Sequence, residues 1–258
     1  MVSVIHRIRR VIQNPLRDGG IAFILASAVF TAPSFATEPP PNLARLVAER
    51  EAAAAAARDH YTYRQTFILE EVPERRTRPA LYREVRDVIF SPSGEKSLQL
   101  VEPVTNTLQR LRLTEEDFRD IYEVQSLLFV PDLLPVYQAT PKGEEIMDGI
   151  DSWVLQVRPR QIFSGQRLFE GMFWVDKRDY SIIRSEGRPV PQLRSKIAGK
   201  ENLFPAFTTL REKVGDHWFP VYTHADDTLD FSTGPIRVKM SIRYRDYKRF
   251  ATESKVLP

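Results

Sequence analysis

Residues 61–70 read YTYRQTFILE, and their side chains alternate between the two faces of an extended chain. One face carries Tyr61, Tyr63, Gln65, Phe67 and Leu69, and the other carries Thr62, Arg64, Thr66, Ile68 and Glu70. A period of two residues is typical of a β-strand with one buried face. The stretch therefore predicts a strand that begins at Tyr61.

Strands of the same kind follow on both sides of a helical segment. Leu81–Phe90 and Lys96–Val101 continue the meander, and turn residues such as Ser91-Pro92-Ser93-Gly94 separate them. After residue 135 the chain returns to strands, which we expect at Val136–Thr140, Glu144–Met147, Trp153–Arg160, Leu168–Asp176, Ser181–Pro189, Phe207–Val214, His217–Leu229 and Ile236–Arg249. Short connections of this kind favour antiparallel pairing.

Two segments predict helices. Residues 42–58 contain a run of alanines and an apolar stripe of Leu43, Leu46 and Val47. Residues 114–130 begin with Thr114 and three acids, carry Phe118 and Ile121 at helical spacing, and are followed by Pro131. The second helix either packs on the sheet or acts as a lid over a cavity, and its apolar pattern fits both roles.

These elements predict a mainly β fold with two helices (α+β). We expect a large curved antiparallel sheet that forms an open half-barrel, with helices on the concave face. Residues 42–250 form one domain in this interpretation. A Pro-rich spacer (37–41) precedes it, and a C-terminal tail (251–258) follows it.

The N-terminal 36 residues have the order of a secretory signal peptide. Four arginines come first, the apolar run Ile21 to Phe30 follows, and Ser34-Phe35-Ala36 supplies small residues at a cleavage site. Ten apolar residues are too few for a transmembrane helix, which needs about 20. We therefore predict a periplasmic or secreted protein with no transmembrane anchor in the mature chain.

Charge and cysteine content exclude several classes of protein. Residues 1–36 hold four of the 37 basic and one of the 34 acidic residues, so the mature chain has 33 of each. A nucleic-acid-binding domain shows a basic excess, and this chain does not. Because cysteine is absent, disulfides, thiol catalysis and thiolate metal sites are excluded.

Catalytic and metal-binding patterns are weak. His217 and His224 lie seven residues apart, which places them on opposite faces of a regular strand. The paired acids Glu70-Glu71, Glu144-Glu145 and Asp226-Asp227 invite a comparison with glycosidases, but adjacent strand residues also face opposite sides. We single out no catalytic residue, metal ligand or cofactor, and a hydrolase acting outside the cytoplasm stays a third alternative.

Several local sequences resemble the periplasmic lipoprotein-carrier superfamily (LolA/LolB-like), which includes the outer-membrane lipoprotein-sorting carriers. In that superfamily a strand of the form Gly-x-x-Trp-Val-Asp precedes a turn and a returning strand. Residues 171–176 (GMFWVD) match it ahead of Tyr180-Ser181-Ile182-Ile183. Further likenesses are YTYR (61–64), YREVRDVIF (82–90), NLFP (202–205) and WFP (218–220). The resemblance covers most of residues 42–250 and implies the open half-barrel.

The resemblance and the supply of aromatic residues suggest a non-enzymatic carrier or sensor that binds a lipid, an acyl chain or a lipoprotein. Candidate lining residues are Phe67, Trp153, Leu155, Phe169 and Phe173, which fall on the apolar faces of three strands. Either the helices fill the concave face or a cavity remains there, and the sequence leaves both open. The alternative function is an envelope protein–protein interaction module that uses exposed sheet edges.

Overall fold

The computed structural model describes residues 38–74, 78–91, 95–123, 129–162, 167–192 and 201–250. The chain separates into two compact units, Met1–Ala36 and Thr37–Pro258, and every described residue belongs to the second. The predicted signal peptide (1–36) and C-terminal tail (251–258) lie outside the described residues.

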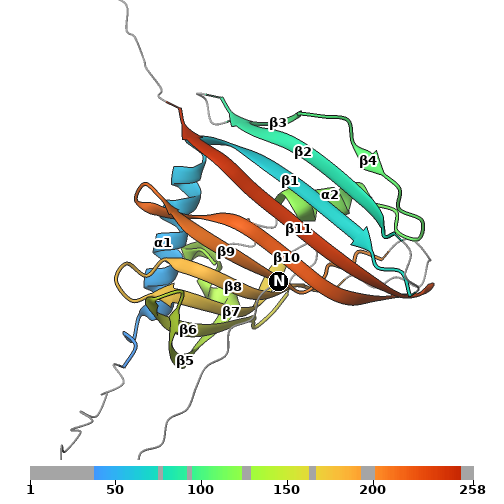
Figure 1. Cartoon of the computed structure of the whole chain (residues 1–258). Helices are drawn as coiled ribbons and strands as arrows, with labels where there is room; N and C mark the ends of the chain where they lie inside the picture. Colours follow the sequence, from blue (N-terminus) through green and yellow to red (C-terminus); the bar gives the residue numbers. More distant parts are fainter. Residues whose placement is uncertain are drawn as a thin grey trace, which may run out of the picture. The chain divides into compact units, whose positions relative to one another are not determined.

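One antiparallel sheet of 11 strands forms the body of this unit (Figure 1). The strands are β1 (Tyr61–Glu71), β2 (Ala80–Phe90), β3 (Lys96–Leu100), β4 (Thr105–Asn106), β5 (Tyr137–Met147), β6 (Ile150–Pro159), β7 (Leu168–Asp176), β8 (Ile182–Val190), β9 (Phe207–Val214), β10 (His217–Phe231) and β11 (Gly234–Arg249). Their order is β3-β2-β1-β11-β10-β9-β8-β7-β6-β5, and β4 pairs with β2.

The first and last strands of the chain are neighbours at the middle of this order. β1 pairs with β11, so one meander runs from β1 to β3 and the other runs back from β11 to β5. Within the described residues the end strands β3 and β5 do not pair with each other, and the sheet stays open. The predicted open half-barrel is confirmed.

The alternation predicted for residues 61–70 is also confirmed. In β1 the buried side chains are those of Tyr63, Gln65, Phe67, Leu69 and Glu71. Opposite them on β11, Met240 lies across from Leu69 and Ile242 lies across from Phe67. We call the side of the sheet that carries these residues the inner face, because the helices cover it.

A glycine pair lets strands β7 and β8 approach closely. Gly171 on β7 lies opposite Gly187 on β8. A Cβ atom added at Gly171 would lie 2.2 Å from the carbonyl oxygen of Glu186 and 2.7 Å from the ring of Phe169. Since the ring of Phe169 packs over both glycines, no larger residue fits at either position.

Helix α1 (Leu43–Arg58) agrees with the predicted helix at residues 42–58. The prediction at residues 114–130 is only partly right. Helix α2 (Glu115–Glu123) starts as predicted, with Asp117 and Thr114 bonded to each other as a capping box. Val130 is extended rather than helical, because the following proline disfavours helical backbone. A 3-10 helix, η2 (Pro131–Val136), begins at that proline.

Two strand predictions need correction. The strands expected at Val136–Thr140 and Glu144–Met147 are one strand, β5, with a register shift between Pro141 and Gly143. A bulge absorbs the turn-like pair Lys142-Gly143, and an edge strand tolerates Pro141, which has no N–H to donate. The short strand β4 has no alternating pattern and was not predicted.

We predict that Gly171→Ala destabilises the domain by about 3 kcal/mol. The added methyl group collides with backbone, and overpacking of this kind typically costs about 1–3 kcal/mol. Denaturant unfolding measures the change. Glu186→Ala, an exposed substitution on the neighbouring strand β8, is the control and should change the stability by less than about 0.5 kcal/mol. A fully stable Gly171→Ala protein would show that the strands do not approach this closely.

Candidate functional site

An apolar cavity of about 250 Å³ lies on the inner face of the sheet. Strands β1, β10 and β11 form its floor with Phe67, Leu69, Leu229, Phe231, Ile236, Val238 and Met240. Its cover comes from two segments far apart in the sequence, residues 110–121 and residues 201–205, which contribute Leu111, Leu113, Ile121, Leu203 and Phe204. Four charged side chains also line it: Arg110, Arg112, Asp117 and Glu201.

Strand alternation explains the floor of the cavity. On β11 the buried residues are Ile236, Val238, Met240, Ile242 and Tyr244, and the residues between them are charged or hydroxylated. The first three line the cavity. Since this strand lies next to β1, its apolar row continues the row of Phe67 and Leu69.

A single carboxylate fixes part of the cover. We call residues 107–113 the strap, because they run from β4 to the start of α2 across the end of β1. Glu71, the last residue of β1, is buried and accepts backbone N–H groups from three consecutive strap residues. The distances are 3.1 Å to Gln109, 2.8 Å to Arg110 and 2.6 Å to Leu111. A carboxylate bound by several N–H groups makes strong, charge-assisted hydrogen bonds.

A buried polar network holds α2 against β2. The guanidinium of Arg86 lies 3.6 Å from the centre of the Tyr122 ring and is hydrogen-bonded to its hydroxyl. The hydroxyl of Tyr82 donates to Glu84 at 2.6 Å, and Glu84 forms an ion pair with Arg86. Burial raises the pKa of the Tyr82 hydroxyl, so this group stays a donor. The network therefore seats α2 beside the cavity.

The inner face under β7–β9 is filled. The rings of Phe169 and Phe173 are stacked with centres 5.1 Å apart, and Phe129 packs against Phe173 at 5.7 Å. Leu43 and Val47 of α1 are buried in the same core cluster. Among the described residues, a void of about 20 Å³ lies between Glu51 of α1 and these strands.

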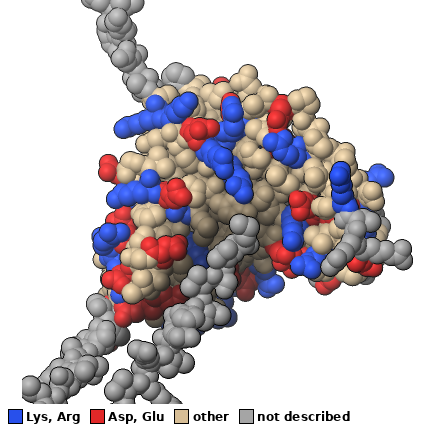
Figure 2. Space-filling view, viewed as in Figure 1, with Lys and Arg blue, Asp and Glu red and all other residues tan. Residues whose placement is uncertain are grey.

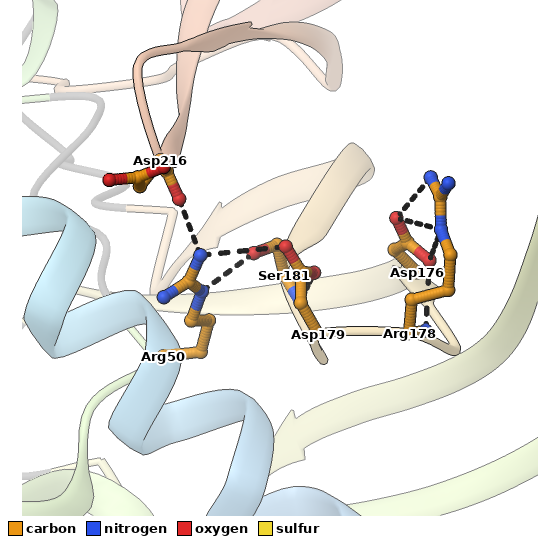
Figure 3. A network of polar contacts seen from close by, with 6 residues as sticks. All are labelled: Arg50, Asp176, Arg178, Asp179, Ser181 and Asp216. Carbon is orange, nitrogen blue, oxygen red and sulfur yellow. Dashed lines mark hydrogen bonds and ion pairs between the residues drawn. The ribbon is translucent and has the colours of Figure 1, made fainter.

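Polar contacts fix α1 in this filled half (Figure 3). Arg50 donates to the hydroxyl of Ser181 at 3.0 Å, to Asp179 at 3.4 Å and to the carbonyl oxygen of Asp216. These three residues come from the β7–β8 and β9–β10 turns. The next residue of the helix, buried Glu51, accepts two hydrogen bonds from the guanidinium of Arg211 on β9, at 2.6 and 2.9 Å.

The turn that receives Arg50 is itself held by Asp176, the last residue of the Trp-Val-Asp sequence. Asp176 is buried, and its carboxylate accepts hydrogen bonds from the backbone and guanidinium of Arg178. Burial raises the pKa of Asp176, but the hydrogen bonds from Arg178 outweigh burial and bring that pKa below its ordinary value. The residues of the predicted motif thus shape a hairpin.

The five predicted lining residues are all buried in one core cluster, but they are not all at the cavity. Phe67 lines it. Phe169 and Phe173 border the small void in the filled half, and Trp153 and Leu155 pack in the core. Their contact with a ligand stays a prediction. Sequence reasoning missed Ile236, Val238 and Met240, although their alternation with charged residues was a usable signal.

The paired acids have structural partners. Asp226 pairs with Arg237 at 3.0 Å, and Asp227 accepts the N–H of Ala206 at 2.9 Å. Glu145 accepts the indole N–H of Trp174 at 2.8 Å, and Glu144 pairs with Lys177. Over the described part of the chain, no three His, Asp or Glu side chains converge in a way that suits a metal ion.

No protein-family profile matches the chain, and no curated protein matches it. Among solved structures, it is similar to a DUF1329 family protein from Desulfovibrio piger at 13% identity and a TM-score of 0.39, covering 84% of this chain and 96% of that chain. It is similar to a LolA superfamily protein from Nitrosomonas europaea at 13% identity and a TM-score of 0.34, covering 81% and 97%.

A third similar structure is a Vibrio parahaemolyticus protein domain named for outer membrane lipoprotein sorting. The identity is 14% and the TM-score is 0.36, with 80% of this chain and 93% of that chain covered. Structures named for the LolA superfamily and for lipoprotein sorting are thus among those to which the chain is similar. Within the described residues, no helix is long and apolar enough to span a membrane.

We predict that Glu71→Gln loosens the strap and destabilises the domain by about 1–3 kcal/mol, the cost of leaving buried hydrogen-bonding groups unsatisfied. The amide loses the negative charge, and its –NH2 group replaces the oxygen that accepts the N–H of Gln109 at 3.1 Å, so a donor faces a donor there. Hydrogen exchange at residues 109–111 should accelerate in the variant, and denaturant unfolding measures the stability. Glu70→Gln, at the neighbouring partly exposed residue, is the control and should change neither quantity appreciably. Unchanged exchange in Glu71→Gln would contradict the anchoring role.

Proposed function

We propose that this chain is a non-enzymatic carrier or sensor that works outside the cytoplasm and holds an apolar chain in the cavity. The observation that carries the proposal is the contrast between the two halves of the inner face. Aromatic side chains and α1 fill one half, whereas about 250 Å³ beside Val238 and Met240 stays open. A well-packed domain leaves few voids larger than a water molecule, so a cavity of this size calls for a ligand.

The chemistry of the cavity favours a hydrocarbon. Its floor consists of aliphatic and aromatic side chains, and burying each methylene group of a ligand contributes about 0.8 kcal/mol. Lipids, acyl chains and the acyl chains of lipoproteins all supply such groups. The predicted signal peptide at residues 1–36 supports a site of action in the periplasm or outside the cell.

The face shown in Figure 2 gives no support to a nucleic-acid partner. On the face shown in Figure 2, acidic and basic side chains are interspersed, and uncharged surface occupies the centre. This mixture agrees with the equal numbers of acidic and basic residues after residue 36.

Two Val→Phe substitutions test the proposal. Val238→Phe places a ring in the open half, so we predict that it leaves stability within about 1 kcal/mol and lowers the affinity for a fluorescent hydrophobic probe at least about tenfold. Val157→Phe, at an equally buried residue that does not line the cavity, is the matched control. Overpacking should cost it about 1–3 kcal/mol, and probe binding by the folded fraction should persist.

To identify the native ligand, the protein is purified from the cell envelope and extracted with organic solvent. The extract is then analysed by mass spectrometry. We expect a lipid or fatty acid to co-purify with the wild-type protein and to be depleted in Val238→Phe. The proposal fails if the wild-type protein yields no lipid and fatty acids do not displace the hydrophobic probe.

An exposed sheet edge supports the second candidate, an envelope protein–protein interaction module. All five residues of β3 are exposed, and within the described residues this strand pairs with β2 on one side only. Leu98 and Leu100 add exposed apolar side chains at 41% and 56% exposure. Such an edge accepts a further strand. Photo-crosslinking in cells from position 100 would capture one protein partner if this function holds, with the cavity empty.

A further inference from the structure

We propose that the ligand of the cavity is a single-chain amphiphile with an anionic head group, and that Arg110 and Arg112 bind the head. This inference rests on the proposed function and specifies its ligand. It follows from the size of the cavity, from the alternation of apolar and charged residues along the strap, and from the hydrogen bonds of the four charged side chains in the lining.

Size limits the number of hydrocarbon chains. Pockets for drug-sized ligands usually occupy about 300–1,000 Å³. The cavity, at about 250 Å³, lies just below this range and accommodates one chain rather than a bundle of two or three. In the filled half, the void that the described residues enclose is about 20 Å³, which is too small for a hydrocarbon chain.

The strap separates apolar from charged side chains at the wall of the cavity. Leu111 and Leu113 are partly buried, pack against the core and line the cavity. Arg110 and Arg112 alternate with them, line the same cavity and are exposed to solvent. An amphiphile that lies along this wall places its hydrocarbon on the leucines and its head beside the two guanidinium groups.

The acids of the lining are engaged by donors of the chain itself. Asp117 accepts hydrogen bonds from the N–H and hydroxyl of Thr114, at 2.7 and 2.8 Å. Glu201 accepts the N–H of Ser232 at 2.8 Å. Both carboxylates therefore already accept hydrogen bonds from the chain, which leaves them less able to bind a cationic head group.

The arginines are less engaged. In the described part of the chain, the guanidinium of Arg110 makes one hydrogen bond, from Nη2 to the carbonyl oxygen of Pro235 at 3.0 Å, and the guanidinium of Arg112 makes none. A guanidinium carries five N–H donors and binds a carboxylate through two of them at once. Charge complementarity at the exposed edge of the cavity thus favours an anionic head.

Three ligands with one chain length and different heads test this inference: dodecanoate, dodecanol and dodecylamine. Each competes with N-phenyl-1-naphthylamine, an uncharged fluorescent probe, for the purified protein below the concentration at which the ligands aggregate. We expect dodecanoate to displace the probe at about tenfold lower concentration than dodecanol. This advantage should shrink at high salt, because the head lies near solvent.

Substitutions assign the effect to the strap. Arg112→Gln alone and the double change Arg110→Gln with Arg112→Gln should weaken dodecanoate toward the affinity of dodecanol and leave dodecanol unchanged. Arg188→Gln is the matched control, because Arg188 is exposed, lies on β8 and makes a long 3.6 Å pair with Glu170. It should leave all three affinities as they are.

The outcomes separate this inference from the proposed function. Equal binding of dodecanoate and dodecanol, or tighter binding of dodecylamine, would overturn the anionic head group while a binding function survives. Dodecanoate binding that persists in both arginine variants would likewise overturn the assignment. Failure of all three ligands to displace a bound probe would contradict the proposed function itself.

Discussion

The inner face of the sheet has to be covered, and the helices are too short to cover it evenly. Nine of the eleven strands, all but β3 and β4, contribute to one apolar face, which includes Phe67, Val238 and Phe173. Helix α1 has 16 residues and α2 has nine. Burial of apolar surface drives each helix onto the face, but it does not select a position along the sheet. Directional polar contacts make that selection.

These contacts place α1 over one part of the inner face, and α2 and the strap over another. Glu51 and Arg50 fix α1 to β9 and to two hairpin turns, whereas Arg86 and Glu71 fix α2 and the strap beside β1 and β2. Breaking a buried ion pair such as Glu51–Arg211 typically costs about 3–5 kcal/mol, because one charge is left without its partner. Helix α1 is therefore held away from α2 and the strap. Between them, apolar side chains of β10 and β11 line the cavity.

The sequence predicted the sheet well, because each strand carries its own signal. Period-two patterns at Tyr61–Glu71 and Gly234–Arg249 depend only on neighbouring residues, and so does the capping box at Thr114. The pairing of β1 with β11 joins the two ends of the domain, and no local pattern contains it. The helix predicted at residues 114–130 was also based on neighbouring residues alone. Phe129, however, packs against Phe173 on the distant strand β7.

The candidate site was harder to predict for the same reason. Alternation shows that Phe169 and Phe173 face inward, but it does not show which side chains lie opposite them. Phe67 faces a cavity because the strap stands off the sheet there, and that distance is set by Glu71 and three backbone N–H groups. The glycine pair under Phe169 depends on two residues 16 positions apart. Only the folded arrangement brings such partners together.

Diffraction from crystals exposed to xenon gas tests directly whether one half of the inner face is open and the other half is filled. Xenon occupies dry apolar cavities and is excluded from packed side chains. We predict xenon beside Val238 and Met240, under the strap, and none beside Phe169 and Phe173. Xenon bound next to the stacked phenylalanines, or a cavity at Val238 closed by its own side chains, would contradict the division of the inner face into an open half and a filled half.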